Sequence, residues 1–197
     1  NLYKELLNFC TVDLSAFYFD IRKDSLYCDS KDSKKRKSTI ILLNVILNSL
    51  LKWFAPILSF TTEEIYKLIM NDNKSIHLTK FLEFPKNFKN ENLNQKWLEL
   101  IKIRNVCNIS IEEKRASKEI GSSLEASLKI NLDKKLNEIS KDVDFSELCI
   151  TSSAEVSYLE SSETNVQTTK AEGSKCQVCW KITKDACSRK TCPQQTE

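Results

Sequence analysis

The sequence predicts a mainly α-helical protein that ends in a small α+β unit and a zinc-ribbon-like module. Only two glycines and three prolines occur among 197 residues, so turns are few and helices are long. Apolar residues make up 41% of the chain, which is enough for a hydrophobic core. The last stretch holds half of the eight cysteines, and this density indicates metal or redox chemistry rather than packing.

The first 120 residues are typical of a bundle of helices. From residue 2 to residue 26, apolar side chains recur at three- and four-residue steps, which predicts one or two amphipathic helices. Residues 38–55 form the most apolar helix and are expected at the centre of the bundle, and Pro56 ends or kinks that helix. Polar residues interrupt the longest apolar stretch, residues 40–58, so it is not predicted to span a membrane.

Two capping boxes predict where further helices begin. They are Thr61-x-x-Glu64 and Asn92-x-x-Gln95, in which each side chain satisfies a backbone N–H of the other residue. The first of these helices is expected to run to about residue 70 and the second past residue 111.

The helical period ends near Gly121. Residues 124–132 alternate apolar and polar side chains, which predicts a half-buried strand, and a short helix at 133–140 and a second strand around 148–156 follow. Residues 157–174 are rich in Ser, Thr and Glu, which is typical of a flexible tether. The predicted domains are a helical bundle (1–120), a small α+β unit (121–156), a flexible linker (157–174) and a zinc-ribbon-like module (175–197).

The cysteine spacing in the tail is typical of a zinc site. Two residues between Cys176 and Cys179 let one tight turn aim both sulfurs at a single point, as zinc knuckles do. Cys187 and Cys192 would complete a four-thiolate site, although four residues separate them where two are usual. Because four thiolates leave no open position for a substrate, we expect one structural Zn²⁺.

Two other interpretations of these cysteines stay open. Eight is an even number, so disulfides are possible, but nothing in the chain suggests secretion. A thioredoxin-like pair would need its Cys-x-x-Cys to open a helix after a strand, and the polar run before Cys176 does not provide that context. The other four cysteines stand singly in apolar segments and are predicted to be small buried residues: Cys10, Cys28, Cys107 and Cys149.

A series of short motifs runs through nearly the entire chain in a fixed order. They are Asp13-Leu-Ser-Ala-Phe-Tyr-Phe-Asp20, Lys23-Asp-Ser-Leu-Tyr-Cys28, Ala55-Pro-Ile-Leu-Ser-Phe-Thr-Thr-Glu-Glu-Ile65, Ser75-Ile-His-Leu78, Glu112-Glu-Lys-Arg115, Ile120-Gly-Ser-Ser-Leu-Glu-Ala126 and Lys175-Cys176-Gln-Val-Cys179-Trp180. The ordered set resembles the carboxy-terminal third of the isoleucyl-tRNA synthetases, a family of class I aminoacyl-tRNA synthetases. That family's tail carries a zinc-binding ribbon, and this sequence departs from its pattern at the second cysteine pair.

The resemblance implies that this chain is the tRNA-binding part of a longer enzyme that is cytoplasmic, monomeric and not attached to a membrane. That parent would join isoleucine to its tRNA through an adenylate made from ATP. Both catalytic signatures of class I synthetases are missing, because the chain has a single histidine, His77, and a single methionine, Met70. We therefore expect no catalytic residue here, and ATP only in the parent's catalytic domain.

The resemblance also implies an anticodon-binding bundle, where bases stack on aromatic or arginine planes and phosphates meet Lys and Arg. The expected tRNA contacts are Lys34, Lys35, Arg36, Lys37, Arg104, Arg115, Trp180, Lys181 and Arg189. Arg104 and Arg115 share one helix face, roughly 16 Å apart at about 1.5 Å per residue. Alternatively, Arg104 pairs with a carboxylate such as Glu63 or Glu64, Trp180 covers the metal knuckle, and the run at 34–37 is a solvated helix start.

Two other functions are compatible with these residues. The chain could be a stand-alone zinc-ribbon protein that binds nucleic acid, or a helical scaffold whose cysteine tail senses oxidation. A formal net charge of +3 does not by itself indicate a nucleic-acid partner. The missing initial methionine favours an internal or carboxy-terminal piece of a longer protein over an independent one.

Overall fold

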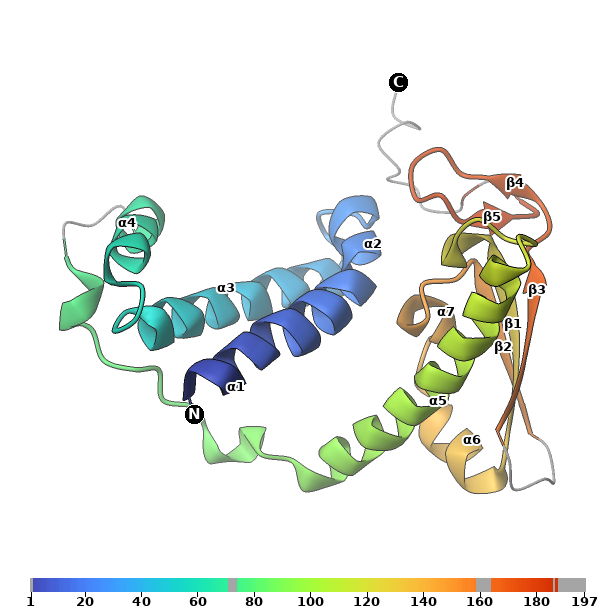
Figure 1. Cartoon of the computed structure of the whole chain (residues 1–197), viewed down its shortest axis with the longest axis horizontal. Coiled ribbons are helices and arrows are strands. Elements are labelled where there is room, and N and C mark those ends of the chain that lie inside the picture. The colour runs from blue at the N-terminus through green and yellow to red at the C-terminus, as the bar shows by residue number, and fades with distance from the viewer. Residues whose placement is uncertain (1, 71–73, 159–163, 186, 188–197) are drawn as a thin grey trace. The chain divides into compact units, whose positions relative to one another are not determined.

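The computed structural model of the chain describes residues 2–70, 74–158, 164–185 and 187 (Figure 1). Helices predominate and a small sheet follows them, so the predicted mainly α-helical fold class is confirmed. The chain divides into two compact units: residues 31–89 form one, and the segments 1–30 and 90–197 form the other. This division differs from the predicted bundle over 1–120, because the helices on either side of 31–89 belong with the sheet.

The chain begins with one continuous helical run. It consists of α1 (Leu2–Asn8), a π-helical segment (Phe9–Phe19) and α2 (Asp20–Cys28). The residues at both junctions keep right-handed helical dihedral angles, so the run is not broken between its parts. It ends where Asp29 turns to an extended conformation. The helix predicted over residues 2–26 is therefore present, with a wider turn in its middle.

The unit formed by residues 31–89 contains α3 (Lys34–Phe54) and α4 (Ser59–Met70), followed by two 3₁₀ turns at Ile76–Leu78 and Lys86–Phe88. Ser33 caps α3 by accepting a hydrogen bond from the backbone N–H of Arg36. As predicted, the chain leaves its helical course at Pro56, where the Ile57 and Leu58 N–H groups donate to the Phe54 carbonyl.

The start of α4 corrects the predicted capping box. The helix begins at Ser59, two residues before Thr61, so Thr61 lies inside the helix and does not cap it. Glu63 instead accepts hydrogen bonds from the Ser75 hydroxyl and the Ile76 N–H, both at 2.9 Å. These bonds hold the first 3₁₀ turn against α4, where Ile76 packs with Leu51 and Ala55 in a small core.

The second unit is organised around α5 (Glu91–Ala116). Asn90 caps it by accepting from the Leu93 N–H at 3.0 Å, so the cap lies two residues before the predicted Asn92. The main buried cluster of the described residues joins α5 to the first strand of the sheet. Residues 38–55, which are the most apolar stretch, are therefore not the centre of the fold as expected.

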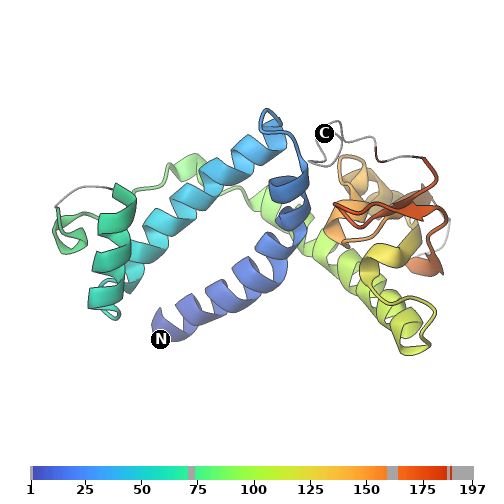
Figure 2. The same ribbon diagram turned by 90° about the horizontal axis from the view of Figure 1, so that it is seen from above.

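The sheet contains β1 (Ala126–Leu132), β2 (Ser153–Tyr158) and β3 (Asn165–Lys170) in the order β2-β1-β3. The central strand β1 pairs in parallel with β2 and antiparallel with β3. Two short helices, α6 (Lys134–Ser140) and α7 (Phe145–Leu148), connect β1 to β2. Alternate residues of β1 are fully buried, as the sequence predicted, and α5 runs along one side of the sheet in both views (Figures 1 and 2).

The third strand is a correction, because residues 157–174 were expected to be a flexible tether. Over 165–170 the chain is instead hydrogen-bonded along β1. Thr168 is buried, and its hydroxyl lies 2.7 Å from the hydroxyl of Ser110 on α5. Composition did not reveal this strand, because most of its side chains are polar. As an edge strand it is stabilised by backbone hydrogen bonds to β1 and by the hydrogen bond of the buried Thr168, so it needs few apolar side chains.

The described helices include none that is long and apolar enough to cross a lipid bilayer.

Candidate metal centre and nucleic-acid interface

The cysteine pair 176/179 lies in a hairpin made of β4 (Ser174–Lys175) and β5 (Ile182–Thr183). The Cys176 N–H donates to the Lys181 carbonyl at 2.9 Å, and the Trp180 N–H donates back to the Cys176 carbonyl at 3.0 Å. Trp180 has a positive φ of 63°, which turns the chain back toward β5. This tight turn places Cys176 and Cys179 on the same side of the loop, as the two-residue spacing predicted.

Gly173 allows the hairpin to close. Its φ is 127°, a value that side chains rarely permit, and an added Cβ would lie only 2.1 Å from the Thr183 carbonyl oxygen. The two strands approach so closely here that no side chain fits between them.

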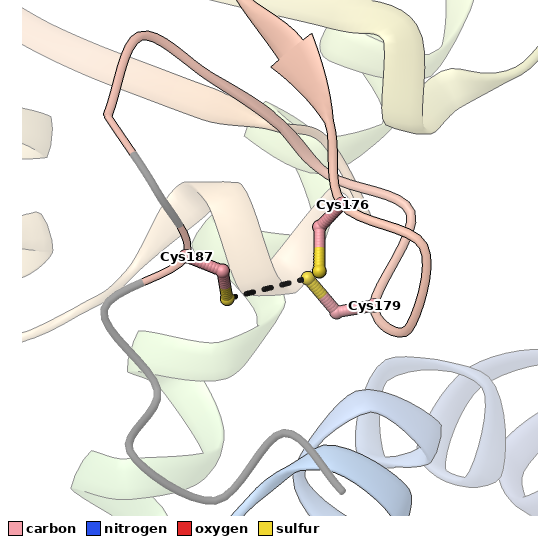
Figure 3. Close-up of side chains that lie close together, drawn as sticks. All are labelled: Cys176, Cys179 and Cys187. Carbon is pink, nitrogen blue, oxygen red and sulfur yellow. Dashed lines mark hydrogen bonds between the residues drawn. The ribbon is translucent and has the colours of Figure 1, made fainter. Parts of the chain in front are cut away.

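Three sulfur atoms converge beside this turn (Figure 3). The Sγ atoms of Cys176, Cys179 and Cys187 lie within 4.8 Å of one another, and those of Cys179 and Cys187 are 3.9 Å apart. Zn²⁺ bound tetrahedrally by sulfurs at about 2.3 Å would place those sulfurs roughly 3.8 Å from each other. The three cysteines therefore fit a metal ion. The fourth predicted ligand, Cys192, lies outside the described residues.

The surroundings of Cys179 disfavour its thiolate form unless a cation is bound. Burial, together with the adjacent Cys176 and Cys187, raises the pKa of the Cys179 thiol to about 12, against the lowering effect of a backbone hydrogen bond at Lys181. Neighbouring thiolates would repel one another in a site that water reaches poorly. A divalent metal removes that repulsion and holds the thiols deprotonated.

The remaining cysteines lie apart from this site. No disulfide joins any of the seven cysteines that the structure describes. Cys28, Cys107 and Cys149 are buried as predicted, whereas Cys10 is only half-buried. A hydrogen bond with Cys107, together with burial, raises the pKa of the Cys149 thiol, so this thiol stays protonated.

The hairpin is docked on the rest of its unit and does not hang on a tether. The Ile182 N–H donates to the Ser152 hydroxyl at 2.7 Å, and that hydroxyl donates to the Leu124 carbonyl. Lys181 lies 3.9 Å from the Asp24 carboxylate of α2 and has a side chain only 16% exposed. The Lys181 ammonium is therefore less accessible to a phosphate than we expected from the sequence.

The basic run at residues 34–37 forms the first turn of α3. Lys34, Lys35 and Lys37 are exposed and Arg36 is half-buried, while Lys37 pairs with Asp32 at 3.0 Å. Positive charge at a helix N-terminus opposes the helix macrodipole and is therefore unfavourable in the free protein. An external anion at this end would relieve the conflict.

The two arginines of α5 have different surroundings. Arg104 donates from Nε to the Leu148 carbonyl at 2.9 Å, and its guanidinium lies 5.3 Å from the centre of the Phe17 ring. Within its own unit, Arg104 is therefore held by a backbone carbonyl and an aromatic face. Arg115 is exposed and pairs with Glu112 at 2.6 Å on its own helix.

Trp180 points outward from the hairpin and is 59% exposed, with the Lys175 ammonium 5.8 Å from its ring centre. Arg189, the last expected tRNA contact, lies outside the described residues. Sequence reasoning missed Arg22, which pairs with Glu147 at 2.7 Å and lies 5.9 Å from the Tyr18 ring centre. No local pattern could have revealed it, because 125 positions separate the two charges.

Comparison with known proteins shows that this sequence is similar to tRNA ligases. The family described as the anticodon-binding domain of tRNA ligase matches residues 1–130. The isoleucine–tRNA ligase of Pelagibacter ubique is 69% identical over 189 residues, which are 96% of this chain and 21% of that protein. The enzyme of the same name from Agrobacterium fabrum is 40% identical, over 92% of this chain and 20% of its own length.

A third relative, the isoleucine–tRNA ligase of Bartonella henselae, is 38% identical over 98% of this chain and 21% of its own length. The chain thus spans about a fifth of the length of the curated relatives that it matches. The similarity continues beyond the family match at residue 130, because the Pelagibacter relative aligns with 96% of the chain.

Proposed function

This chain belongs to the family of anticodon-binding domains of tRNA ligases, and we propose that it holds the tRNA for isoleucine within a longer isoleucine–tRNA ligase. The observation that carries the proposal is the family match over residues 1–130 together with 69% identity to an isoleucine–tRNA ligase over 96% of the chain. The parent enzyme would use ATP in a catalytic domain outside this sequence, act as a monomer and work in the cytoplasm. This part supplies binding and no catalytic residue.

The basic first turn of α3 is the first proposed phosphate contact. Its charges oppose the helix dipole in the free protein, and a phosphate would interact favourably with both the lysines and the backbone N–H groups. Phosphate contacts position an RNA without reading its sequence. We therefore assign Lys34, Lys35, Arg36 and Lys37 to affinity for tRNA and not to the choice of isoleucine tRNA.

Arg115, Trp180 and Arg189 are proposed as further contacts. Arg115 is exposed on α5, and its guanidinium pairs with Glu112 of the same helix in a surface ion pair of a type that contributes little to stability. Trp180 is well exposed and can stack on an unpaired base. Arg104 and Lys181 are more enclosed, and we assign them to the edge of the interface, where each is already held by an intramolecular partner.

We assign one structural Zn²⁺ to Cys176, Cys179, Cys187 and Cys192. The convergence of three sulfurs supports the assignment, and four thiolates would leave the ion no position for a substrate. When bound, the ion neutralises the thiolates and supplies folding free energy to a hairpin with little hydrophobic core, on the order of 10 kcal/mol. The hairpin residues then present Trp180 to the solvent in a fixed orientation.

The proposal is tested by binding of the 197-residue chain to isoleucine tRNA and to valine tRNA over a range of salt concentrations. We expect tighter binding of isoleucine tRNA. Replacing Lys34, Lys35 and Lys37 by Gln is expected to weaken binding of both tRNAs and to reduce the salt slope by roughly 0.7 to 0.9 per lost contact.

The matched control replaces three exposed lysines elsewhere, Lys134, Lys135 and Lys141, by Gln. This variant removes the same formal charge and should retain the salt slope of the unmodified chain. Equal losses in both variants would mean that only net charge matters, and equal affinity for the two tRNAs would contradict the assignment to isoleucine.

A further inference from the structure

The three converging sulfurs differ in how far the solvent reaches them. Cys179 is buried, whereas Cys176 and Cys187 are half-buried. The Sγ atoms of Cys179 and Cys187 face each other at 3.9 Å (Figure 3). The site therefore holds an enclosed sulfur beside one that a small solute can reach.

The backbone holds the two half-buried cysteines differently. The Cys176 N–H donates to the Lys181 carbonyl, and the Cys176 carbonyl accepts from the Trp180 N–H, so this cysteine is fixed inside the hairpin turn. Cys187 lies beyond Thr183, the residue at which the pairing of β4 with β5 ends. Since the sulfurs of a disulfide are about 2.05 Å apart, closing one from 3.9 Å requires an approach of about 2 Å. Cys187 can make this approach without breaking a pair of the hairpin ladder.

The chemistry of the cluster favours oxidation at its accessible sulfur. A bound metal holds its cysteine ligands as thiolates, and the thiolate is the form of cysteine that attacks an oxidant. Four thiolates outnumber the two positive charges of the ion, so the sulfurs keep an excess of negative charge. Susceptibility to oxidation follows thiolate character and exposure, and Cys187 combines both.

The cysteines outside the cluster are less suited to this reaction. Cys28, Cys107 and Cys149 are buried. Cys10 is half-buried like Cys187, but burial raises the pKa of its thiol above the ordinary value. At neutral pH Cys10 is therefore almost entirely a protonated thiol, and it provides an internal reference of comparable exposure.

We propose that Cys187 is a site of reversible oxidation by hydroperoxides and that Cys179 resolves the oxidised sulfur. The Cys187 thiolate attacks one oxygen of hydrogen peroxide and becomes a sulfenic acid, while the O–O bond breaks and the other oxygen takes up a proton and leaves as water. The Cys179 thiolate then attacks the Cys187 sulfur, the S–S bond forms, and the hydroxyl group leaves as water with a second proton. Two electrons pass from the two sulfurs to the peroxide.

The inference rests on the proposed metal assignment and goes beyond the proposed tRNA binding. When Cys179 and Cys187 are joined to each other, the cluster loses two of its ligands and the metal is released. The hairpin then loses the folding free energy that metal binding supplies. A disulfide can be reduced by thiol–disulfide exchange, so a thiol reductant together with Zn²⁺ restores the site. The cluster is thus a redox-sensitive switch for the order of the hairpin.

The test uses the 197-residue chain loaded with one equivalent of Zn²⁺ and treated with hydrogen peroxide at neutral pH. A chromophoric chelator reports the released zinc, and tryptic digestion with mass spectrometry locates the disulfide. Trypsin cuts after Lys181 and Lys184, which places Cys187 on a different peptide from Cys176 and Cys179. A disulfide from Cys187 therefore joins two peptides, and fragment spectra of the joined pair identify its partner.

We expect zinc release to follow the same time course as formation of the Cys179–Cys187 disulfide. Both should be at least about tenfold faster than oxidation of Cys10, because a thiol of ordinary pKa is only a few per cent thiolate at neutral pH. A thiol reductant with added Zn²⁺ should restore the bound metal. The matched control, Cys10→Ser, should release zinc at the rate of the unmodified chain.

Retention of zinc while Cys10 becomes oxidised would overturn the inference and leave the metal assignment in place. Zinc release with a disulfide between Cys176 and Cys179, with one to Cys192, or with irreversible oxidation of Cys187 to a sulfinic acid would also overturn it. A chain that binds no zinc would contradict the metal assignment together with the inference. The proposed tRNA binding is measured separately by the salt titration, so it can fail or hold independently of these results.

Discussion

Side-chain chemistry at the cysteine hairpin depends on pH. Burial and two neighbouring cysteines raise the pKa of the Cys179 thiol to about 12, so in the absence of a cation this group is protonated at neutral pH. Metal binding requires the thiolate, and each thiol that becomes a ligand releases its proton. The affinity for metal must therefore increase as the pH rises.

We predict that Zn²⁺ affinity falls by at least tenfold for each pH unit between 8 and 6, since at least one proton is exchanged for the ion. Competition with a chromophoric chelator at several pH values measures this dependence. Cys179→Ser should lose most of the bound metal, whereas Cys10→Ser, outside the cluster, should keep it. Metal affinity that does not change with pH would contradict a thiolate site.

Asp144 is a second residue whose ionisation contributes to the fold. Its side chain accepts hydrogen bonds from the backbone N–H groups of Ser146 and Glu147 and so caps α7. Partial burial raises the pKa of Asp144, but the hydrogen bonds from Ser146 and Glu147 and the nearby Lys181 lower it by more. Because the pKa of Asp144 is lower in the folded than in the unfolded protein, the carboxylate stabilises the fold fully at pH values above the pKa of the unfolded state. This stabilisation is lost as the pH falls through the pKa of the folded state.

Asp144→Ala is expected to reduce the free energy of unfolding by about 1 kcal/mol at pH 7, as for other helix caps. At pH 2, below the ordinary pKa of an aspartate, the difference between variant and unmodified chain should be smaller, because the contribution of the carboxylate declines as the pH falls toward and through its folded-state pKa. Denaturant titrations at the two pH values provide the measurement, with the exposed Asp142→Ala as the control. An equal difference at both pH values would show that the charge of Asp144 does not matter.

At the level of elements, β3 shows that composition alone is a weak guide. Residues 157–174 have the composition of a linker, yet 165–170 pair along β1 and contact α5. The alternation in this segment is short: Val166 packs against the core and Thr168 is buried, while their neighbours are exposed. Two inward-facing side chains are enough to hold β3 in the sheet, because β1 supplies the partners for its backbone hydrogen bonds.

A comparison of two adjacent threonines distinguishes a strand from a tether. Thr168→Ala removes the partner of the Ser110 hydroxyl and should lower the free energy of unfolding by about 1 to 2 kcal/mol. Thr169→Ala, at the exposed neighbouring position, should change it by less than about 0.5 kcal/mol. Chemical denaturation measures the free energy of unfolding of both variants. Equally small changes in the two would contradict the strand and favour a flexible linker at residues 165–170.

At the scale of the whole molecule, the cysteine hairpin is coupled to the body of its unit. The Ile182 N–H is bonded to Ser152, which precedes β2, and Lys181 lies near Asp24 of α2. The same loop and α2 together line a pocket of about 340 Å³. Loss of a metal from the three sulfurs would therefore loosen a binding surface as well as a local turn.

Chelation of the metal is expected to speed hydrogen exchange at the Trp180 and Ile182 amides by at least tenfold, because both bonds depend on the closed hairpin. The Ile130 amide, in the central strand of the sheet, should keep its protection. Exchange read residue by residue by NMR, before and after chelation, measures both. Unchanged protection at Ile182 would mean that the hairpin holds its position without metal.

Much of the fold follows from local periodicity. The helical run over 2–28, α3, α5 and β1 are visible in the sequence because each repeats its apolar residues with the period of its own secondary structure. Helix starts were less predictable: Asn90 and not Asn92 caps α5, and Thr61 caps nothing. A side chain can cap a helix only at the residue where the chain enters the helix from a non-helical conformation. The position of that entry depends on packing with residues that are distant in the sequence.

The sequence by itself determined the helical class, the buried face of β1 and the close approach of Cys176 to Cys179, since neighbours along the chain fix all three. The sequence also named Cys187 as a ligand, and the tertiary structure set its distance from the other two sulfurs. Only the tertiary structure decided that Arg104 binds the Leu148 carbonyl and that β3 completes the sheet. Those contacts join residues that are far apart in the chain or separated by irregular loops. Their partners are chosen by the packing of the folded core, which no local pattern encodes.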